Sequence, residues 1–473
     1  MLRVFLIIFR INLMEDDKKN IIGKDYSLFG LAKYALPAIA ARFFRSLLST
    51  IDDTLFISRY CGEYALASFS LVIPLTLFVE SVNTMLGAAA TKCSMMMGEK
   101  KGDKAHGVFT SIIFVELLFG VVVYLLISNY SEEVLRLLGA TDILMPYGKE
   151  YLSIFRLFMP ISCINGIFDR FYSVAGKTKT SMFSTVVNVF CNFFFDWLLI
   201  VNMDLGVSGA GYANLIANIA QFIIGVLVYS NRKSDIHFSK PILKFWDYLK
   251  QICRLGLTDA VSFVSYAISG LLANRVLIEY GSENYMAAYS ITDTLYMLFT
   301  VAFFGLTAST CPLVSYAFGE KNKEKLVGLF KKISLLMTIL AIVSTSTSMI
   351  LKDFVLGIYL NNYEVQEIID LAHFGMKIVP LSNIFYGYNL LVQEIAIAVG
   401  NTKVSMTLTI LENFVFINIT TFLLPVMFGA KATFFNFLSA ELITFFFTLY
   451  AVIKNKDLYG YGRSGVATLI EDK

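Results

Sequence analysis

The sequence predicts an all-α membrane protein of twelve transmembrane helices, arranged as two parallel six-helix repeats around a central cleft. Three observations support this fold class. Hydrophobic residues make up 56% of the 473 residues, and they gather in runs of the roughly 20 residues that a spanning helix needs. Charged residues contribute only 16%, whereas soluble domains carry about 25%. Finally, motifs of the first half of the chain recur in the second half.

The apolar runs, separated by polar breaks, give the expected spans. Because backbone groups in the hydrocarbon core must pair with one another, each run is expected to be a helix. The spans of the first half lie near residues 28–58, 64–95, 106–128, 146–176, 179–201 and 206–230, and those of the second half near residues 252–279, 284–316, 326–350, 365–399, 403–425 and 430–453.

Lysine and arginine residues predict the orientation, because cytoplasmic connections carry an excess of them. Every second connection is rich in these residues, and the alternate connections hold few. Both termini are therefore expected to face the cytoplasm, with the protein in the inner (cytoplasmic) membrane. The basic connections contain Lys100, Lys101 and Lys104; Lys177 and Lys179; Arg232, Lys233, Lys240, Lys244 and Lys250; Lys321, Lys323 and Lys325; and Lys403.

Four pairs of similar motifs recur at an offset of about 220 residues. Each half holds an even number of spans, so the repeats share one orientation and are related by an axis along the membrane normal. This architecture is typical of a carrier. The matching strings are YCGEYALASFS and YGSENYMAAYS, GEKKGDKA and GEKNKEKL, FMPISCI and IVPLSNI, and AGKTKTSM and VGNTKVSM.

The expected organisation has five parts. A basic connector is expected to be amphipathic and to lie on the cytoplasmic membrane surface, the alternative being a solvated linker. Its apolar residues at helical spacing are Ile242, Leu243, Phe245, Trp246 and Leu249. For the first residues there are two expectations: translation begins at Met14 rather than at Met1, or residues 1–13 form a helix on the membrane surface. The parts are a cytoplasmic segment 1–25, an N-terminal lobe 26–230, the connector 231–251, a C-terminal lobe 252–453 and a cytoplasmic tail 454–473.

Several function classes are disfavoured by the residues present. The six cysteines and three histidines are scattered, without the spacing of a zinc or redox site, and no cofactor is expected. The sequence contains no HExxH, GxSxG or Walker motif, so the chain is not expected to be an enzyme. The formal net charge of +3 is too small to favour binding of nucleic acid.

Several strings resemble the multidrug and toxic compound extrusion (MATE) family. LPAIAARFFRSLLSTIDDTLFISRYCGEYALASFSLVIP and GEKKGDKA resemble its first helices, GVSGAGYAN its sixth helix, and LGLTDAVS and PLVSYAFGEKNKEK its second half. The resemblance implies two six-helix lobes, alternating access, and export of cationic or amphipathic organic compounds driven by Na+ or H+. We expect such a chain to act as a monomer surrounded by membrane lipid.

Ionisable groups inside spans are costly and usually mark pathways. Asn188, Asn192 and Asp196 are spaced i, i+4, i+8 in the fifth span, and Asn214 and Asn218 are four apart in the sixth. Such spacing places each set along one side of its helix. The alternative is that these polar groups only bond neighbouring helices.

The resemblance adds a first-helix acid to this set, and Asp53 occupies the matching position, followed by Thr, Leu and Phe. It implies a cation site of Asp53, Asn192, Asp196 and Asn214, with Asn165 as a further ligand. Oxygen ligands suit Na+, and a carboxylate in a low dielectric can also carry a proton, so both coupling ions stay open. In the second half of the chain, Ala273 stands at the position that corresponds to Asp53, and Thr420 at the one that corresponds to Asp196. The cation site is therefore expected only in the N-terminal lobe.

Other acids within spans have two readings. Asp293 and Glu394 are candidates for attracting a cationic substrate in the cleft, whereas some of the acids are expected to pair with Arg156, Arg170 or Arg275. The remaining acids of this set are Glu80, Glu116, Asp169, Asp259, Glu412 and Glu441.

Pro37 lies within the first span, where it removes a backbone hydrogen bond. The two interpretations are bending of this helix during transport and a static packing kink.

The leading alternative for the function of the whole chain is a related flippase or an exporter of a lipid-linked or non-drug metabolite. Such flippases line their cavity with Arg or Lys, and the abundance of acids within the spans disfavours that cargo.

Overall fold

The computed structural model describes residues 21–49, 53–242, 244–360 and 365–456. The question of Met1 or Met14 as the start concerns residues outside this description. Within it, eleven helices are long and apolar enough to cross a membrane. The remaining expected span corresponds to α2 (Leu28–Ser49), which carries three basic residues, Lys33, Arg42 and Arg45.

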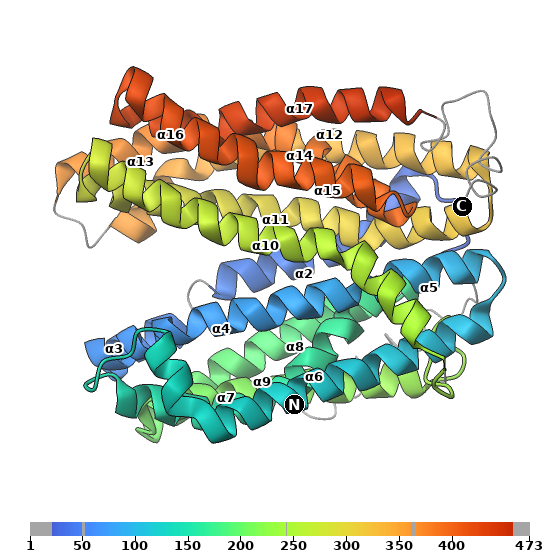
Figure 1. The fold of residues 1–473 in the computed structure, drawn as a ribbon, viewed down its shortest axis with the longest axis horizontal. Coiled ribbons are helices and arrows are strands. Elements are labelled where there is room, and N and C mark those ends of the chain that lie inside the picture. Colours follow the sequence, from blue (N-terminus) through green and yellow to red (C-terminus); the bar gives the residue numbers. More distant parts are fainter. Residues whose placement is uncertain (1–20, 50–52, 243, 361–364, 457–473) are drawn as a thin grey trace. The chain divides into compact units, whose positions relative to one another are not determined.

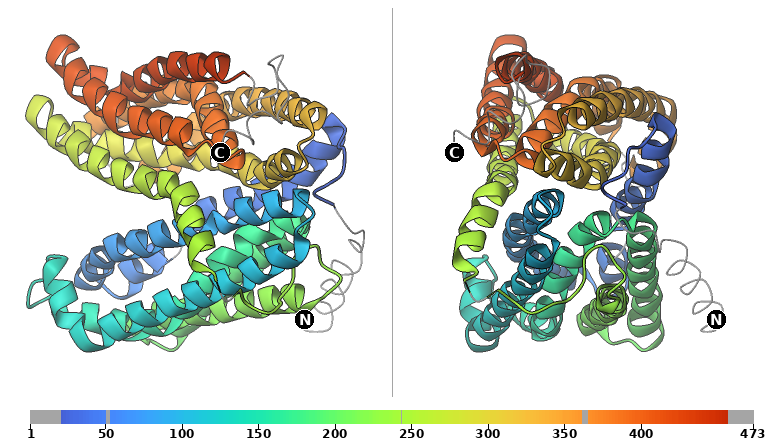
Figure 2. Two further views of the ribbon diagram at one scale, coloured as in Figure 1. Left: turned by 45° about the vertical axis from the view of Figure 1, so that its right-hand side comes forward. Right: turned by 90° about the vertical axis from the view of Figure 1, so that its right-hand side faces the viewer.

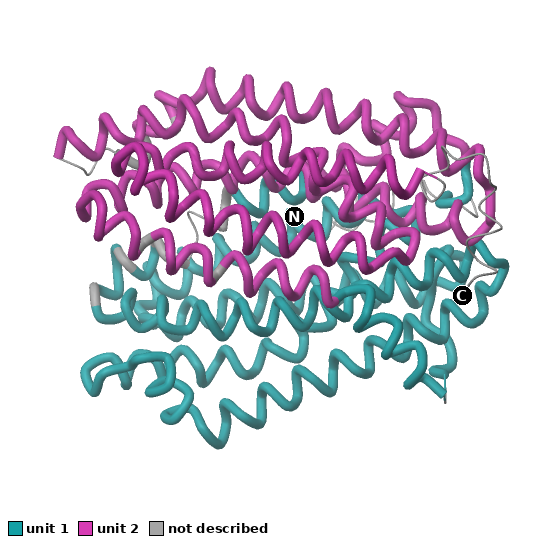
Figure 3. The backbone as a smooth tube through the Cα atoms, turned by 45° about the horizontal axis from the view of Figure 1, so that its top comes forward, with its two compact units in different colours: residues 1–24, 40–256 teal, residues 25–39, 257–473 magenta. Residues whose placement is uncertain are grey.

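The chain divides into two compact units (Figure 3): unit 1 holds residues 1–24 and 40–256, and unit 2 holds residues 25–39 and 257–473. Besides the second part of α2, the helices of unit 1 are α3 (Asp53–Tyr60), α4 (Glu63–Gly87), α5 (Ala89–Gly98), α6 (Gly102–Leu137), α7 (Met145–Val174), α8 (Thr178–Asp196), the π-helix η1 (Trp197–Asn202) and α9 (Gly206–Ser230).

Helix α10 (Trp246–Tyr280) runs from unit 1 into unit 2. The other elements of unit 2 are α11 (Glu283–Gly319), α12 (Lys323–Leu360), α13 (Gln366–Ile378), η2 (Val379–Ser382), α14 (Asn383–Ala398), α15 (Thr402–Ile410), the π-helix η3 (Leu411–Phe416), α16 (Ile417–Phe428), η4 (Ala430–Phe435) and α17 (Asn436–Lys454) (Figure 1).

Packing within unit 1 is organised by α7, which lies between α6 and α9 (Figure 2). Phe109 and Ile112 of α6 are fully buried. On another face of α6, Phe114, Leu118 and Leu125 are 57%, 64% and 51% exposed, and their spacing aligns them along the helix. This apolar face is not covered by the described part of the protein. On a helix of this length and hydropathy, such a face is suited to contact with lipid tails.

The boundary between the units differs from the lobes expected at 26–230 and 252–453, because it falls inside helices α2 and α10. A close approach explains the crossing in α2: a Cβ atom on Gly305 of α11 would lie 2.6 Å from the Ile39 Cα atom. The first part of α2 therefore packs on unit 2. Further along α2, Arg45 forms an ion pair of 3.2 Å with Asp169 of unit 1.

The connector after α9 differs from the expected surface helix. Residues 231–242 form no helix, and α10 begins only at Trp246. The Ser239 and Ile242 N–H groups each donate, over 2.9 Å, to hydroxyls of α6, those of Thr110 and Ser111. Ile236 is fully buried. Hydrogen bonds to α6 thus replace those that a surface helix would make within itself.

The repeats share the same helix-ending turn. Lys100 and Lys321 hold matching positions in the GEKK and GEKN strings, and their φ angles are 62° and 57°, a left-handed conformation that is uncommon outside glycine. In both turns the following residue donates its N–H back into the helix, from Lys101 to Met96 over 2.8 Å and from Asn322 to Ala317 over 3.2 Å. Such turns cap the last carbonyls of a helix. The repeat therefore extends to the backbone conformation.

Gly256 permits close contact of α10 with α4, because a Cβ atom there would lie 1.9 Å from the Met85 carbonyl oxygen. Replacing Gly256 with Ala is expected to destabilise the protein by about 1–3 kcal/mol, since overpacking forces the helices apart. Thermal unfolding in detergent measures the effect. Gly270→Ala on the same helix is the matched control, because nothing lies within 4 Å of the place that its added methyl group would occupy. Equal midpoints for the two variants would contradict the prediction.

Candidate functional site

Two of the three predicted polar residues of α8 are buried in unit 1, and the third, Asn188, is partly buried. Asp196, the last residue of α8, is fully buried and Asn192 is 5% exposed. The π-helix η1 begins directly after Asp196, and π-helical turns are frequent at functional sites. α8 and η1 pack against α9. An acid buried at the start of irregular backbone is an arrangement suited to binding a small cation.

Helix α3, which begins at Asp53, packs against α8, α9 and η1. The Phe56 and Phe193 rings meet edge to face with their centroids 5.3 Å apart, and Phe193 is adjacent to Asn192. The side chain of Asp53 lies outside the described residues. The backbone thus places the predicted first-helix acid on a helix that packs against α8.

The predicted residues Asn165 and Asn214 belong to a second set of polar contacts, between α7 and α9. The Asn165 side-chain amide donates to the Asn218 backbone oxygen over 2.9 Å and to its side-chain oxygen over 3.2 Å. Asn218 donates to the Asn214 backbone oxygen over 2.9 Å, and Asn214 donates to that of Ala210 over 3.1 Å. The Asn165 side-chain oxygen is buried without a hydrogen-bond partner among the described residues. This oxygen is available to a ligand.

Asp169 is one of the intramembrane acids for which an arginine partner was considered, and its partner comes from another helix. Asp169 pairs with Arg45 rather than with Arg156, Arg170 or Arg275, and it also accepts hydrogen bonds from the Gln221 side chain over 3.1 and 3.2 Å. The reason is tertiary: α2 brings Arg45 to α7, although the two residues are far apart in the sequence.

The predicted substrate acids lie on different helices of unit 2. Asp293 on α11 accepts a hydrogen bond of 2.8 Å from the Tyr266 hydroxyl, and its second oxygen has no hydrogen-bond partner in the described part of the chain. Glu394 on α14 is half-buried. The Asp293 hydrogen bond thus runs to Tyr266 of α10 and does not connect this acid to Glu394.

Unit 2 contains a carboxylate–amide network that sequence reasoning missed. Glu412 and Glu441 are 3% and 6% exposed. Asn389 donates to the Glu441 carboxylate over 2.8 Å and Gln393 donates to that of Glu412. Buried acids and amides therefore come together in unit 2 as well as in unit 1, whereas the cation site was predicted only for the first six helices.

Threonines complete this network. The Thr448 hydroxyl donates to the Asn389 side-chain oxygen over 2.8 Å, and the Thr409 hydroxyl donates to that of Gln393 over 2.6 Å. Asn389 and Gln393 are four residues apart on α14, the same spacing as Asn192 and Asp196. That spacing was the available signal, but the two acids come from other segments, so the sequence did not connect them.

A family sequence model and the similar proteins of known function indicate the same family. The sequence model of the MatE family matches residues 37–198 and 260–423, one match in each half of the chain. The multidrug export protein MepA of Staphylococcus aureus is 23% identical over 434 residues, which cover 90% of this chain and 94% of MepA. MepA of Staphylococcus saprophyticus is 25% identical over 441 residues, covering 91% and 94%.

Two solved structures show the same fold. One is an outward-facing multidrug resistance MATE family transporter of the MOP superfamily, with a TM-score of 0.85, 18% identity, and coverage of 93% of this chain and 99% of the other. The second is a MOP superfamily transporter from Pyrococcus furiosus, with a TM-score of 0.84, 18% identity and the same coverage. Its binding pocket is described as having reversed polarity, suggesting a different function.

Proposed function

Since the chain belongs to the MATE family of multidrug efflux transporters, we propose that it exports organic cations or amphipathic compounds in antiport with Na+ or H+ by alternating access. The observation that carries the proposal is the buried Asn192–Asp196 stripe beside η1, on helices packed against α3 and α9. A buried carboxylate needs a compensating proton or cation. The MepA relatives are multidrug export proteins, which supports the same class of cargo.

The proposed coupling site consists of Asp53, Asn192 and Asp196, with Asn214 and Asn165 as additional oxygen ligands. Carboxylate and amide oxygens are ligands for Na+, and a carboxylate alone can take a proton. Asp293 and Glu394 remain candidates for attracting the cationic substrate. The Lys and Arg distribution supports a location in the inner membrane with both termini in the cytoplasm, and we expect the protein to act as a monomer.

The deciding experiment is efflux of a fluorescent organic cation from vesicles that contain the purified protein. A Na+ gradient and a H+ gradient are imposed separately. The proposal expects one of them to drive efflux and dissipation of that gradient to stop it. If neither gradient drives any organic cation tested, the function passes to the second candidate, an exporter of a lipid-linked or non-drug metabolite. The reversed pocket polarity of the Pyrococcus structure supports keeping that candidate.

Pro37, inside α2, lies three residues before the boundary between the units. We expect Pro37→Ala to impair efflux while expression stays intact, because restoring the missing backbone hydrogen bond opposes bending of the helix. The measurement is the initial efflux rate per amount of protein. An unchanged rate would favour a static packing kink.

A further inference from the structure

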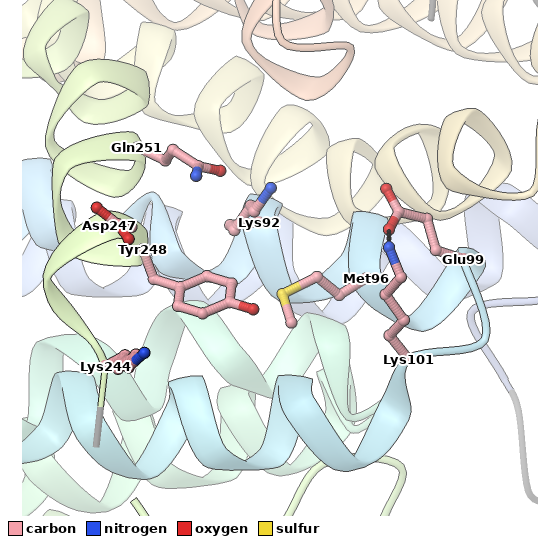
Figure 4. A pocket seen from close by; sticks show the side chains of 8 residues that line it. All are labelled: Lys92, Met96, Glu99, Lys101, Lys244, Asp247, Tyr248 and Gln251. Atoms are coloured by element: carbon pink, nitrogen blue, oxygen red, sulfur yellow. Dashed lines mark hydrogen bonds and ion pairs between the residues drawn. The ribbon is translucent and has the colours of Figure 1, made fainter. Parts of the chain in front are cut away.

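Unit 1 contains a cavity of about 370 Å³ between the end of α5, the turn that follows it, and the first turns of α10 (Figure 4). In Figure 4, Tyr248 reaches from α10 toward Met96 of α5. The cavity is unrelated to the Asn192–Asp196 stripe. Its lining residues are Lys92, Met96, Glu99, Lys101, Lys244, Asp247, Tyr248 and Gln251.

The charges of the lining leave two lysines for a ligand. The Lys101 ammonium donates to the Glu99 carboxylate over 2.6 Å, and this hydrogen bond raises the pKa of Lys101. Lys92 and Lys244 form no ion pair with any residue that the structure describes. Asp247 lies in the first turn of α10, where the helix dipole stabilises a negative charge. With three lysines and two acids, the lining carries a small excess of positive charge.

The cavity lies where two membrane-spanning helical segments end. Tyr64–Gly98 contains Lys92 and Met96, and Trp246–Tyr280 begins beside Lys244. Trp246 is 65% exposed, and the Lys250 ammonium lies 5.7 Å from its ring centroid. Exposed tryptophan and lysine at the end of a span are typical of the membrane–water interface. In the proposed orientation this end is cytoplasmic.

We propose that this cavity binds the headgroup of a membrane phospholipid. Lys92 and Lys244 contact the phosphate, the Tyr248 hydroxyl donates to it, and Met96 contacts the apolar part of the lipid. A phosphodiester carries a single negative charge, which matches the small positive excess better than a free phosphate ion does. Bound in this way, the lipid joins α5 to the start of α10 within unit 1, a role separate from the proposed export activity.

Lipid-induced stabilisation of the full-length protein in detergent tests the proposal. The thermal midpoint is followed during titration with phosphatidylglycerol, with diacylglycerol of the same acyl chains, and with inorganic phosphate. Only phosphatidylglycerol is expected to raise the midpoint. Lys92→Gln combined with Lys244→Gln is expected to weaken this binding at least about tenfold, since a contact to a charged group is stronger than one between neutral groups. Lys100→Gln with Lys104→Gln, which removes the same charge outside the lining, is expected to bind like the parent.

Three outcomes would overturn the proposal. Equal stabilisation by diacylglycerol would mean that the phosphate is not recognised. Stabilisation by inorganic phosphate at concentrations similar to those of the lipid would assign the cavity to a soluble anion. Equal lipid affinity of the two double variants would exclude Lys92 and Lys244 as contacts. Gel filtration and the thermal midpoint without lipid show whether each variant is folded. Tyr248→Phe, which removes one hydroxyl, is a milder variant that is expected to weaken lipid binding without loss of folding.

Discussion

Replacing Asp196 with Asn is expected to remove the coupling of efflux to the ion gradient while substrate binding persists. Asn has nearly the same shape and keeps an oxygen ligand, but it has no negative charge and takes up no proton at neutral pH. A hydrogen bond or contact to a charged group contributes about 1.5–3 kcal/mol, so the driving ion should bind at least about tenfold more weakly. Asp53→Asn is expected to act in the same direction.

Two quantities are measured. The first is the Na+ or H+ concentration that gives half-maximal efflux from vesicles, and the second is the affinity for the substrate, determined by fluorescence anisotropy. Asp204→Asn is the matched control, because Asp204 is exposed, lies shortly after η1 and undergoes the same change of charge. If Asp196→Asn and the parent depend equally on the ion, the coupling site in unit 1 is excluded, whatever the transported substrate proves to be.

Replacing Asn389 with Leu is expected to destabilise unit 2 strongly. The substitution removes the amide that donates to the Glu441 carboxylate over 2.8 Å and the oxygen that accepts from Thr448. A buried group that loses its partner costs about 1–3 kcal/mol, and more when it is charged. The thermal midpoint in detergent should therefore fall clearly below that of the parent.

A double-mutant cycle separates the lost partner from the lost packing. Replacing both members, Asn389→Leu with Glu441→Leu, leaves no stranded carboxylate and should recover a large part of the midpoint, because removing both partners of a buried pair is often nearly neutral. Additive losses in the double variant would show that Asn389 and Glu441 are not coupled. The same variants, assayed for efflux, show whether this network affects transport.

The sequence by itself determined the membrane class, the positions of the spans and the internal repeat. These features depend on composition and on local spacing: apolar runs must be helical in lipid, and the GEKK and GEKN strings end their helices in the same left-handed turn. The α8 stripe was also predictable, because i, i+4 spacing on one helix fixes which side chains share a side.

Only the tertiary structure decided which distant residues meet. Arg45 reaches Asp169 across 124 positions of the chain, and Glu441 reaches Asn389 across 52. The connector was expected to form an amphipathic surface helix, but hydrogen bonds to Thr110 and Ser111 hold it against α6. Such contacts depend on how helices pack, which spacing within one segment does not specify. The sequence thus determined the repeated helical frame, and helix packing determined the partners of its buried charges.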